Sequence, residues 1–152
     1  MLYGYHMLPD RHAAPELRPI LTLRSRVAAI RELAAGECVS YHRTFIAARH
    51  SRIAVLPIGY ADGYSRHLSN RAQVLIGGRR APVVGLVCMD LTMVDVTEVP
   101  GVRPGDEVIL IGSQGTGSIS AQDVAAWANT IPYEVLCGLG PRIVREYRGT
   151  IA

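Results

Sequence analysis

The sequence contains no lysine, and all 16 basic residues among its 152 residues are arginine. A Walker A phosphate loop requires a lysine, so that class of nucleotide site is excluded. The formal net charge is only +3, and the longest basic run is the pair Arg79-Arg80 beside two glycines. Scattered arginines and a small net charge indicate a solvated surface rather than a nucleic-acid-binding patch.

Long apolar runs are also missing. No stretch approaches the roughly 18 consecutive apolar residues that a membrane-spanning helix needs. The first nine residues have no basic region followed by an apolar core, so they do not have the pattern of a signal peptide. We therefore expect no membrane partner.

Cysteine and histidine do not occur in the spacings that hold metals or disulfide frameworks. Cys38, Cys88 and Cys137 are odd in number and show no C-x-x-C spacing. Free thiols of this kind predict a reducing, cytoplasmic compartment. The five histidines show neither H-x-H nor H-E-x-x-H spacing, so we expect no metal site.

The chain length predicts one domain after a proline-rich leading segment. Three prolines break regular structure in residues 1–19, and the domain is expected to occupy residues 20–152. Alternating apolar and polar residues from Ile20 predict a strand, with a slip in phase at Ala28-Ala29 that indicates a bulge. Gly77-Gly78 predicts a hairpin between flanking strands.

One helix is predicted near the C-terminus, because Ser120 and Asp123 match a capping box. Four apolar residues then share one face at helical spacing: Val124, Trp127, Ala128 and Ile131. A short helical turn is expected over residues 132–136 and a closing strand over residues 142–147. Many short strands with one well-capped α-helix predict a mainly β fold, a small Greek-key-like β-barrel.

A tyrosine and an aspartate follow the apolar run 53–58 in a turn between two glycines. The turn carries Tyr60 and Asp62 between Gly59 and Gly63. Glycine lets a ligand or another backbone approach closely, so such a turn is typical of a binding site. The plainer alternative is a strand that ends in a turn, with Tyr60 as a half-buried aromatic.

Tyr41 and the segment Cys88-Met89-Asp90 each allow two interpretations. Tyr41 is either a cross-strand aromatic or a proton carrier. A phenol is a poor base at neutral pH, so the second role requires neighbouring cations or hydrogen bonds. Cys88 and Met89 are either core residues or part of a turn that presents a backbone N–H to an anion.

Two further features favour no site. The glycine-rich run 112–117 lies between a predicted strand and helix, but its order does not match G-x-G-x-x-G, so it is interpreted as a connector. Asp62, Asp90 and Asp95 are dispersed, and their spacing predicts no pair of catalytic carboxylates.

Taken together, these segments resemble the C-terminal β-domain of alanine racemase, the pyridoxal phosphate enzyme that interconverts L- and D-alanine. The resemblance covers about residues 17–148, and its motifs occur in the family's order at similar intervals. The matching motifs lie at residues 39–41, 57–63, 81–85, 87–90, 106–112, 131–135 and 141–142.

The resemblance implies a site shared between two subunits. In that family an N-terminal (α/β)₈ barrel holds the cofactor, and the β-domain of one subunit faces the barrel of the other in a head-to-tail homodimer. By resemblance, Tyr41 exchanges a proton with the α-carbon of alanine, the amide of Met89 binds the substrate carboxylate, and Tyr133 bonds to the cofactor phosphate. Four residues would line the substrate-access corridor: Tyr60, Arg66, Asp90 and Ile131. The implied product, D-alanine, serves bacterial peptidoglycan.

Within this resemblance the missing lysine gains a specific meaning. A covalent bond to pyridoxal phosphate requires a lysine amine, and this chain has none. We therefore expect residues 1–19 to be the end of a barrel absent from this sequence, and residues 20–152 to be the β-domain. The 152 residues alone are predicted to have no racemase activity.

Two departures from the family pattern keep other functions open. His42 stands where the family often has glycine, and Leu86 stands where an arginine commonly precedes Cys-Met-Asp. The loss of that arginine keeps a serine or broad-specificity racemase as an alternative. A non-catalytic β-barrel module that binds protein or nucleic acid is the alternative from another functional class.

Overall fold

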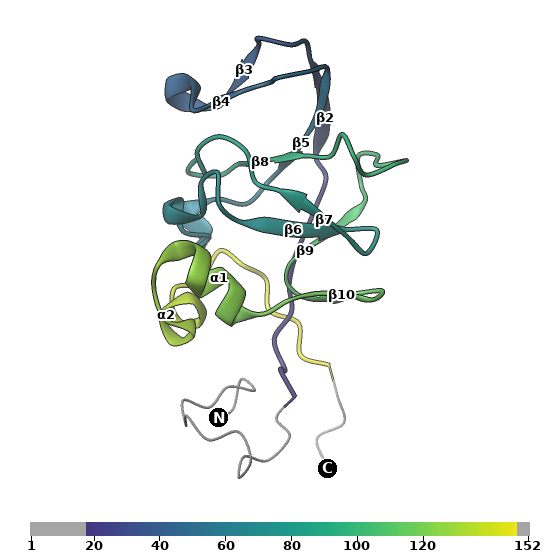
Figure 1. Cartoon of the computed structure of the whole chain (residues 1–152). Coiled ribbons are helices and arrows are strands. Elements are labelled where there is room, and N and C mark those ends of the chain that lie inside the picture. The colour runs from purple at the N-terminus through teal and green to yellow at the C-terminus, as the bar shows by residue number, and fades with distance from the viewer. Residues whose placement is uncertain (1–17, 149–152) are drawn as a thin grey trace.

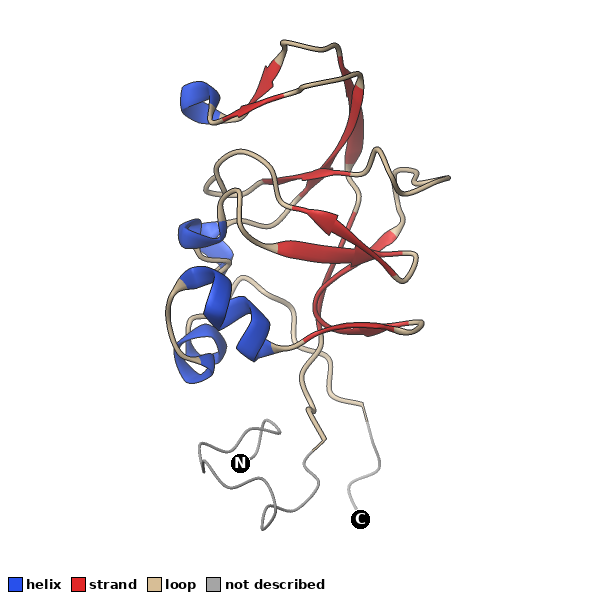
Figure 2. Cartoon of the chain, viewed as in Figure 1, coloured by secondary structure: helices blue, strands red, loops and turns tan. Residues whose placement is uncertain are grey.

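The computed structural model describes residues 18–148, which form a mainly β structure with two α-helices on one side (Figures 1 and 2). The strands of this part are β1 Leu23–Arg26, β2 Ala29–Leu33, β3 Cys38–Val39, β4 Phe45–Ile46, β5 Ser51–Leu56, β6 Gln73–Ile76, β7 Arg79–Pro82, β8 Thr92–Asp95, β9 Glu107–Gln114 and β10 Gly117–Ile119. The helices are α1 Ala121–Ala128 and α2 Pro132–Cys137, with short 3-10 turns η2 Tyr41–Arg43, η3 Tyr60–Asp62 and η4 Arg66–Leu68. The mainly β prediction is confirmed, while most of the leading segment 1–19 lies outside the described residues.

The strands form three antiparallel sheets. The largest has the order β1-β9-β6-β7, with β10 also paired to β9. A second sheet has the order β2-β5-β8, and β3 pairs with β4 alone. The small β3–β4 sheet stands at the far end of the molecule from the two α-helices (Figure 1).

The chain passes from the first sheet to the second at the predicted phase slip. The Val27 amide donates to the Asp106 carbonyl, whereas the next amide, that of Ala28, donates to Val55. Consecutive amides therefore bond to different sheets. The irregularity predicted at Ala28-Ala29 is this change of partner, and the register shift within β1 lies earlier, between Leu23 and Arg24.

The predicted β-barrel is wrong for the described residues, because the sheets do not close. Between the end of β7 and strand β8, the two larger sheets are joined by one isolated bridge, which pairs Val83 with Val94. Pro82 ends β7, and proline cannot donate to a continuing ladder. The Val83 amide then bonds to Ala72, and the Val84 amide bonds to Met93 in β8. The chain turns a corner here without extending either sheet.

The core lies where the two central strands of the largest sheet meet the helices. Val74, Leu75 and Ile76 in β6 are all buried, and so are the apolar residues 108–111 in β9. A strand buried on both faces loses the polar alternation of a half-exposed strand, which explains these continuous apolar runs. Helix α1 packs on this core through Val124 and Ala128.

Helix α1 begins as its sequence predicts and ends earlier than predicted. The Ser120 hydroxyl accepts from the Asp123 amide at 3.0 Å, and the Asp123 carboxylate accepts from the Ser120 amide at 2.7 Å. The helix ends at Ala128, because Asn129 takes a left-handed conformation with φ 57°. Ile131, predicted on the same helical face, instead caps the separate helix α2, which has Pro132 in its first turn.

Two other local predictions are corrected. The glycine-rich run 112–117 is part of a hairpin, because β9 continues to Gln114 and turns at Gly115-Thr116 into β10. Residues 142–147 were expected to form a closing strand, but they are not part of any sheet. They run along the molecule as an extended segment held by arginine side chains.

Candidate active site

The glycine-bracketed turn at residues 59–63 lies directly against the segment that carries Met89. The amide of Tyr60 donates to the Cys88 carbonyl at 3.0 Å, and the amide of Ala61 donates to the Met89 carbonyl at 3.0 Å. A Cβ atom on Gly59 would lie 2.2 Å from the Cys88 oxygen. The turn therefore requires glycine at position 59, because the two backbones are in contact there.

Asp62 and Asp90, which seemed dispersed in the sequence, meet at one arginine. The Arg142 Nε atom lies 3.1 Å from Asp62 Oδ1, and its Nη2 atom lies 2.6 Å from Asp90 Oδ1. The second oxygen of Asp62 accepts from the Gly59 amide at 2.9 Å. The two carboxylates thus share a cation and do not form a catalytic pair.

Tyr41 lies on a strained loop that one hydroxyl fastens to the segment before Met89. Ser40 Oγ donates to the Leu86 carbonyl at 2.9 Å and accepts from the Leu86 amide at 3.0 Å. The backbone φ is positive at Ser40, His42 and Arg43. Such conformations cost about 1 kcal/mol each for residues other than glycine, so the surrounding contacts must hold them.

The left-handed φ of 60° at His42 explains one departure from the family pattern. Glycine takes this conformation at little steric cost, whereas histidine takes it with strain. The backbone at this position therefore has the shape that a glycine would have. The other departure, Leu86, is half-buried and bonds to Ser40 only through its backbone.

The turn around η4 supports the same segment from the other side. Asn70 Oδ1 accepts from the Gly85 amide at 2.6 Å, and Ser69 Oγ accepts from the Val87 amide at 2.9 Å. The Arg66 guanidinium donates to the Val87 carbonyl at 3.2 Å. Arg66, predicted in the access corridor, therefore also supports the backbone just before Met89.

Tyr133 and Ile131 come from the start of α2, whose far end touches the glycine turn. A Cβ atom on Gly63 would lie 2.0 Å from the Gly138 carbonyl oxygen, so the turn and the end of α2 are in backbone contact. Tyr133 is half-buried, and Ile131 is 51% exposed. The structure thus connects all four segments that carry the predicted site residues, namely 40–44, 59–70, 85–91 and 131–142.

The predicted site presents apolar surface and unused hydrogen-bonding groups. Tyr41 is 66% exposed and Met89 is 54% exposed. Within residues 18–148, the hydroxyls of Tyr41 and Tyr133 and the backbone amide of Met89 make no hydrogen bond. These groups are available to a ligand or to another polypeptide.

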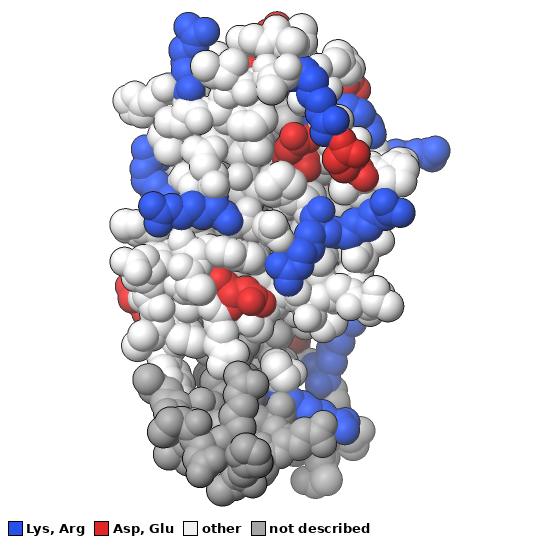
Figure 3. Space-filling model, viewed as in Figure 1, with Lys and Arg blue, Asp and Glu red and all other residues white. Residues whose placement is uncertain are grey.

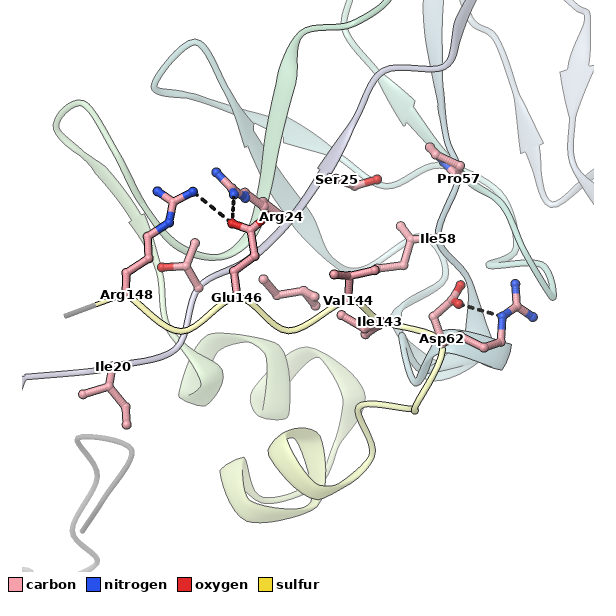
Figure 4. A pocket seen from close by; sticks show the side chains of 13 residues that line it. Ile20, Arg24, Ser25, Pro57, Ile58, Asp62, Ile143, Val144, Glu146 and Arg148 are labelled. Carbon is pink, nitrogen blue, oxygen red and sulfur yellow. Dashed lines mark hydrogen bonds and ion pairs between the residues drawn. The ribbon is translucent and has the colours of Figure 1, made fainter. Parts of the chain in front are cut away.

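A cavity of about 600 Å³ lies beside this site, between β1 and the C-terminal segment (Figure 4). The Asp62–Arg142 ion pair stands at one end, and Glu146 with Arg24 and Arg148 stands at the other (Figure 4). A hydrogen bond from Arg148 and the charge of Arg24 lower the pKa of Glu146. Of the predicted site residues, none lines this cavity. Its chemistry is that of a surface ion network rather than of the predicted site.

A second cavity, of about 410 Å³, lies between the glycine turn and the helices. It is lined by Tyr60 and Tyr64 from the turn and by Glu134 and Leu139 from the α2 region. The hydroxyl of Tyr64 is buried and has no partner within the described part of the chain. Burial raises the pKa of Tyr64.

Three other expectations can be compared with the structure. The arginines are spread over the visible face without one cluster (Figure 3). Among residues 18–148, no group of three or more His, Cys, Asp or Glu side chains could hold a metal ion, and no helix could cross a membrane. In the same range all three cysteines are free.

The fit to pyridoxal phosphate is partial. Tyr133 offers an unused phenol to a phosphate group, and the Met89 amide offers a donor to a carboxylate. The chain has no lysine to bind the cofactor covalently. The residues present therefore offer hydrogen-bond donors to the cofactor and substrate but no amine for covalent attachment.

The described residues thus form a mainly β domain with unused polar groups beside exposed apolar side chains. Comparison with known proteins identifies its family. The sequence matches the family described as "Alanine racemase, C-terminal domain" over residues 20–147, and the chain belongs to that family.

The relatives are considerably longer than this chain. The chain is 52% identical over 151 residues to the alanine racemase of Halothermothrix orenii, covering 99% of this chain but 40% of that protein. A crystal structure of alanine racemase from E. faecalis superimposes with a TM-score of 0.87 at 40% identity, covering 96% of this chain and 39% of that one. The alanine racemase of Bartonella henselae, whose structure contains covalently bound pyridoxal phosphate, gives a TM-score of 0.86 at 35% identity, again covering 96% and 39%.

Sequence reasoning missed the residues that hold the site together. Ser40, Asn70 and Arg142 bond to segments 46, 15 and 52 positions away. No local spacing reveals partners at such distances. Ser40 and Arg142 had one signal, because each lies in a motif that carries the family resemblance, 39–41 and 141–142.

Proposed function

We propose that this chain is the C-terminal domain of a pyridoxal phosphate-dependent alanine racemase, which interconverts L- and D-alanine and supplies D-alanine for peptidoglycan. The observation that carries the proposal is the pair of unused donors, the Tyr41 hydroxyl and the Met89 amide, on two loops joined by Ser40. Membership of the family over residues 20–147 supports the choice of reaction.

Racemisation requires a proton to leave the α-carbon on one face and to return on the other. The Tyr41 hydroxyl carries the proton on one face. Its exposure of 66% suits a group that must reach a substrate held by another polypeptide. Arg43 and His42 lie next to it in the sequence, and further cations from the rest of the protein would stabilise the phenolate.

The Met89 amide binds the carboxylate of the substrate. A backbone N–H that has no internal partner is a fixed donor for an anion. Two hydrogen bonds from the glycine turn, to the carbonyls of Cys88 and Met89, hold the peptide groups on either side. The substrate is thereby oriented toward the loop of Tyr41.

The cofactor is held mainly by residues outside this sequence. Pyridoxal phosphate, when bound, supplies the electron sink that lets the α-carbon lose its proton. In this chain Tyr133 donates to the cofactor phosphate. The lysine that binds the cofactor is expected in the part of the relatives that this chain does not span, since the chain covers 40% of the relative from Halothermothrix orenii.

The partner of this domain is the barrel of a second subunit in a head-to-tail homodimer. Five large apolar side chains on the site segments are more than 40% exposed, namely Tyr41, Tyr60, Met89, Leu91 and Ile131. Exposed apolar side chains gathered around a site favour contact with another protein surface. Tyr60, Arg66, Asp90 and Ile131 then form the access corridor. The free cysteines are consistent with a cytoplasmic enzyme.

The decisive experiment is Tyr41→Phe in the full-length enzyme. We expect kcat for L-alanine racemisation to fall at least about 100-fold, the usual scale for a positioned acid or base. The matched control is Tyr147→Phe, because Tyr147 is 91% exposed and belongs to none of the site segments. Equal activity of the Tyr41→Phe and Tyr147→Phe enzymes would favour the non-catalytic binding module and contradict the proposal.

Leu86 gives a specific reason to test a second substrate. It replaces an arginine expected beside the corridor, so the corridor carries less positive charge than the family pattern implies. Kinetics of the full-length enzyme with alanine and serine separate an alanine racemase from a serine or broad-specificity racemase. The 152-residue chain mixed with pyridoxal phosphate should racemise neither amino acid and should show no absorption band of lysine-bound cofactor.

A further inference from the structure

The geometry points to Arg142 as a positioning residue that fixes the Met89 amide for the substrate carboxylate and offsets part of the negative charge of two aspartates beside it. This inference rests on the proposed function, since it concerns how substrate binds in that same site. Arg142 opens the extended segment 142–147, and no residue of this segment is assigned above to substrate or cofactor.

Arg142 joins three segments at one point. Its Nη2 atom binds Asp90, the residue that follows Met89, at 2.6 Å. Its Nε atom binds Asp62 at 3.1 Å, and Asp62 in turn accepts from the Gly59 amide. The chain just before Arg142 is also bonded to the backbone of Asp62, because the Gly140 amide donates to the Asp62 carbonyl at 2.9 Å.

The shape of the arginine side chain suits this junction. A guanidinium presents donors in a rigid planar fork, so its two nitrogens can bind carboxylates that come from different directions. A lysine would supply one compact charge at one point. The contacts to Asp62 and Asp90 use two different nitrogens of the fork, which a lysine cannot reproduce.

The charges also require a cation here. Asp62 is buried, with a side chain only 11% exposed, and a buried carboxylate without a partner is strongly unfavourable. Asp90 stands one residue from the amide that would bind the substrate carboxylate, so an uncompensated Asp90 would repel the substrate. The hydrogen bond from Arg142 to Asp90 and the charge of Asp62 raise the pKa of Arg142, so the guanidinium stays charged at every working pH.

The junction therefore has two consequences for catalysis. It restrains the peptide between Cys88 and Asp90 and so keeps the Met89 N–H in place. It also reduces the negative charge around that N–H, because the guanidinium offsets one of the two carboxylates. Both effects act on substrate binding and leave the proton carrier Tyr41 untouched, so loss of Arg142 is expected to change KM more than kcat.

The test uses the full-length enzyme with Arg142→Met and with Arg142→Met combined with Asp90→Asn. The first variant should raise the KM for alanine about three- to tenfold, with kcat within about twofold, on the scale of a partly exposed ion pair. The second should recover part of that rise, because neutralising Asp90 removes the uncompensated charge next to the Met89 amide, while Asp62 still lacks its cation. A structural defect alone would not be relieved by a second substitution.

The matched control is Arg145→Met. This arginine lies three residues further along the same segment, and within residues 18–148 it binds only backbone carbonyls, those of Leu139 and Gly140. It removes the same formal charge, and we expect KM to change less than twofold. An equal rise in KM for the Arg142 and Arg145 variants would overturn the inference.

Hydrogen exchange of the full-length protein tests the restraint without using activity. Peptides that cover residues 88–91 should exchange faster in Arg142→Met than in the unmodified enzyme. If Arg142→Met does not fold, Arg142→Lys and Asp90→Asn should still accelerate exchange there, because each breaks part of the junction. Unchanged exchange in both would refute the restraint. An unmodified enzyme that fails to racemise alanine would refute the proposed function alone, since the exchange measurement tests Arg142 independently.

Discussion

Gly59→Ala is predicted to destabilise this domain through backbone contact alone. The added Cβ would lie 2.2 Å from the Cys88 carbonyl oxygen and 2.4 Å from that of Met89. Both atoms belong to backbone, so no side chain can rotate away. The φ of Gly59 is −156°, an extended conformation open to any residue, and the whole cost comes from the contact.

The size of the effect follows from the hydrogen bonds that the contact would break. Relief of the clash must separate the two backbones by about 1 Å, and this stretches the bonds from Tyr60 to Cys88 and from Ala61 to Met89 beyond hydrogen-bonding range. Each such bond contributes about 1 kcal/mol, and overpacking adds about 1–3 kcal/mol. We expect a loss of about 3 kcal/mol in the free energy of unfolding.

Gly101→Ala is the control, because Gly101 has the unfavourable backbone conformation without the close contact, whereas Gly59 has the close contact without the unfavourable conformation. Gly101 has a left-handed φ of 75°, but a Cβ there would meet nothing within 4 Å. Its substitution should cost about 1 kcal/mol through backbone conformation alone. A scale based on φ would rank Gly101→Ala as the worse change, whereas close approach ranks Gly59→Ala as the worse.

Urea unfolding of the 152-residue chain, followed by far-ultraviolet circular dichroism, measures both costs. With a slope of about 1–3 kcal/mol per molar, a loss of 3 kcal/mol lowers the midpoint by about 1–3 M. If Gly101→Ala lowers the midpoint more than Gly59→Ala does, the argument from backbone contact fails. In the full-length enzyme, Gly59→Ala should also raise the KM for alanine, because the Met89 amide moves.

Two further substitutions test the interior and the helix start. Tyr64→Phe should raise the free energy of unfolding at pH 7 by up to about 1 kcal/mol, and with it the urea midpoint. The reason is that the substitution removes a buried hydroxyl that has no partner within residues 18–148. Burial raises the pKa of Tyr64 in the folded chain above its pKa in the unfolded chain. The stability that depends on the protonated phenol is therefore fully present below about pH 10 and is lost as the pH rises further. The free energy of unfolding should therefore fall less steeply between about pH 9 and 11 in Tyr64→Phe than in the unmodified chain. Equal slopes would contradict this expectation. Ser120→Ala should cost about 1 kcal/mol, since Ser120 caps α1, while Ser118→Ala on the neighbouring exposed strand should cost less than half as much in the same unfolding assay.

The parts of the fold that depend on short-range chemistry could be predicted from the sequence. The start of α1 depends on Ser120 and Asp123, three residues apart, and the structure contains both bonds of the predicted box. The hairpin at Gly77-Gly78 depends on two adjacent glycines with positive φ. Each of these elements is decided by contacts within a few residues.

The arrangement of the sheets could not be predicted in the same way. A regular alternation of strands suggests closure into a barrel, but closure depends on which strand each amide selects. Val27 and Ala28 are adjacent apolar residues, yet their amides bond to different sheets. Pro82 then prevents β7 from continuing the ladder. The sequence pattern predicts strands and contains no direct signal for these choices.

The site shows the same division. Tyr60 and Asp62 were conspicuous because two glycines bracket them, and that local signal correctly indicated a close backbone approach. The partner of the approach, residues 88–89, and the arginine that joins Asp62 to Asp90 lie far along the chain. Local pattern identified the turn, while its function as a scaffold depends on contacts that only the folded chain creates.

The contrast between Tyr60 and Tyr41 explains why the conspicuous tyrosine need not be the reactive one. Tyr60 lies on a turn in which every amide of residues 59–63 donates a hydrogen bond, and the turn begins and ends at glycines. Tyr41 lies between residues with positive φ, at Ser40, His42 and Arg43, and none of these is glycine. Strain of this kind persists only where other contacts enforce it, and here the Ser40 hydroxyl and the close approach of Gly85 provide them. The loop therefore keeps a strained backbone while the Tyr41 side chain stays exposed. We expect this arrangement of a side chain that acts on a group held by another polypeptide.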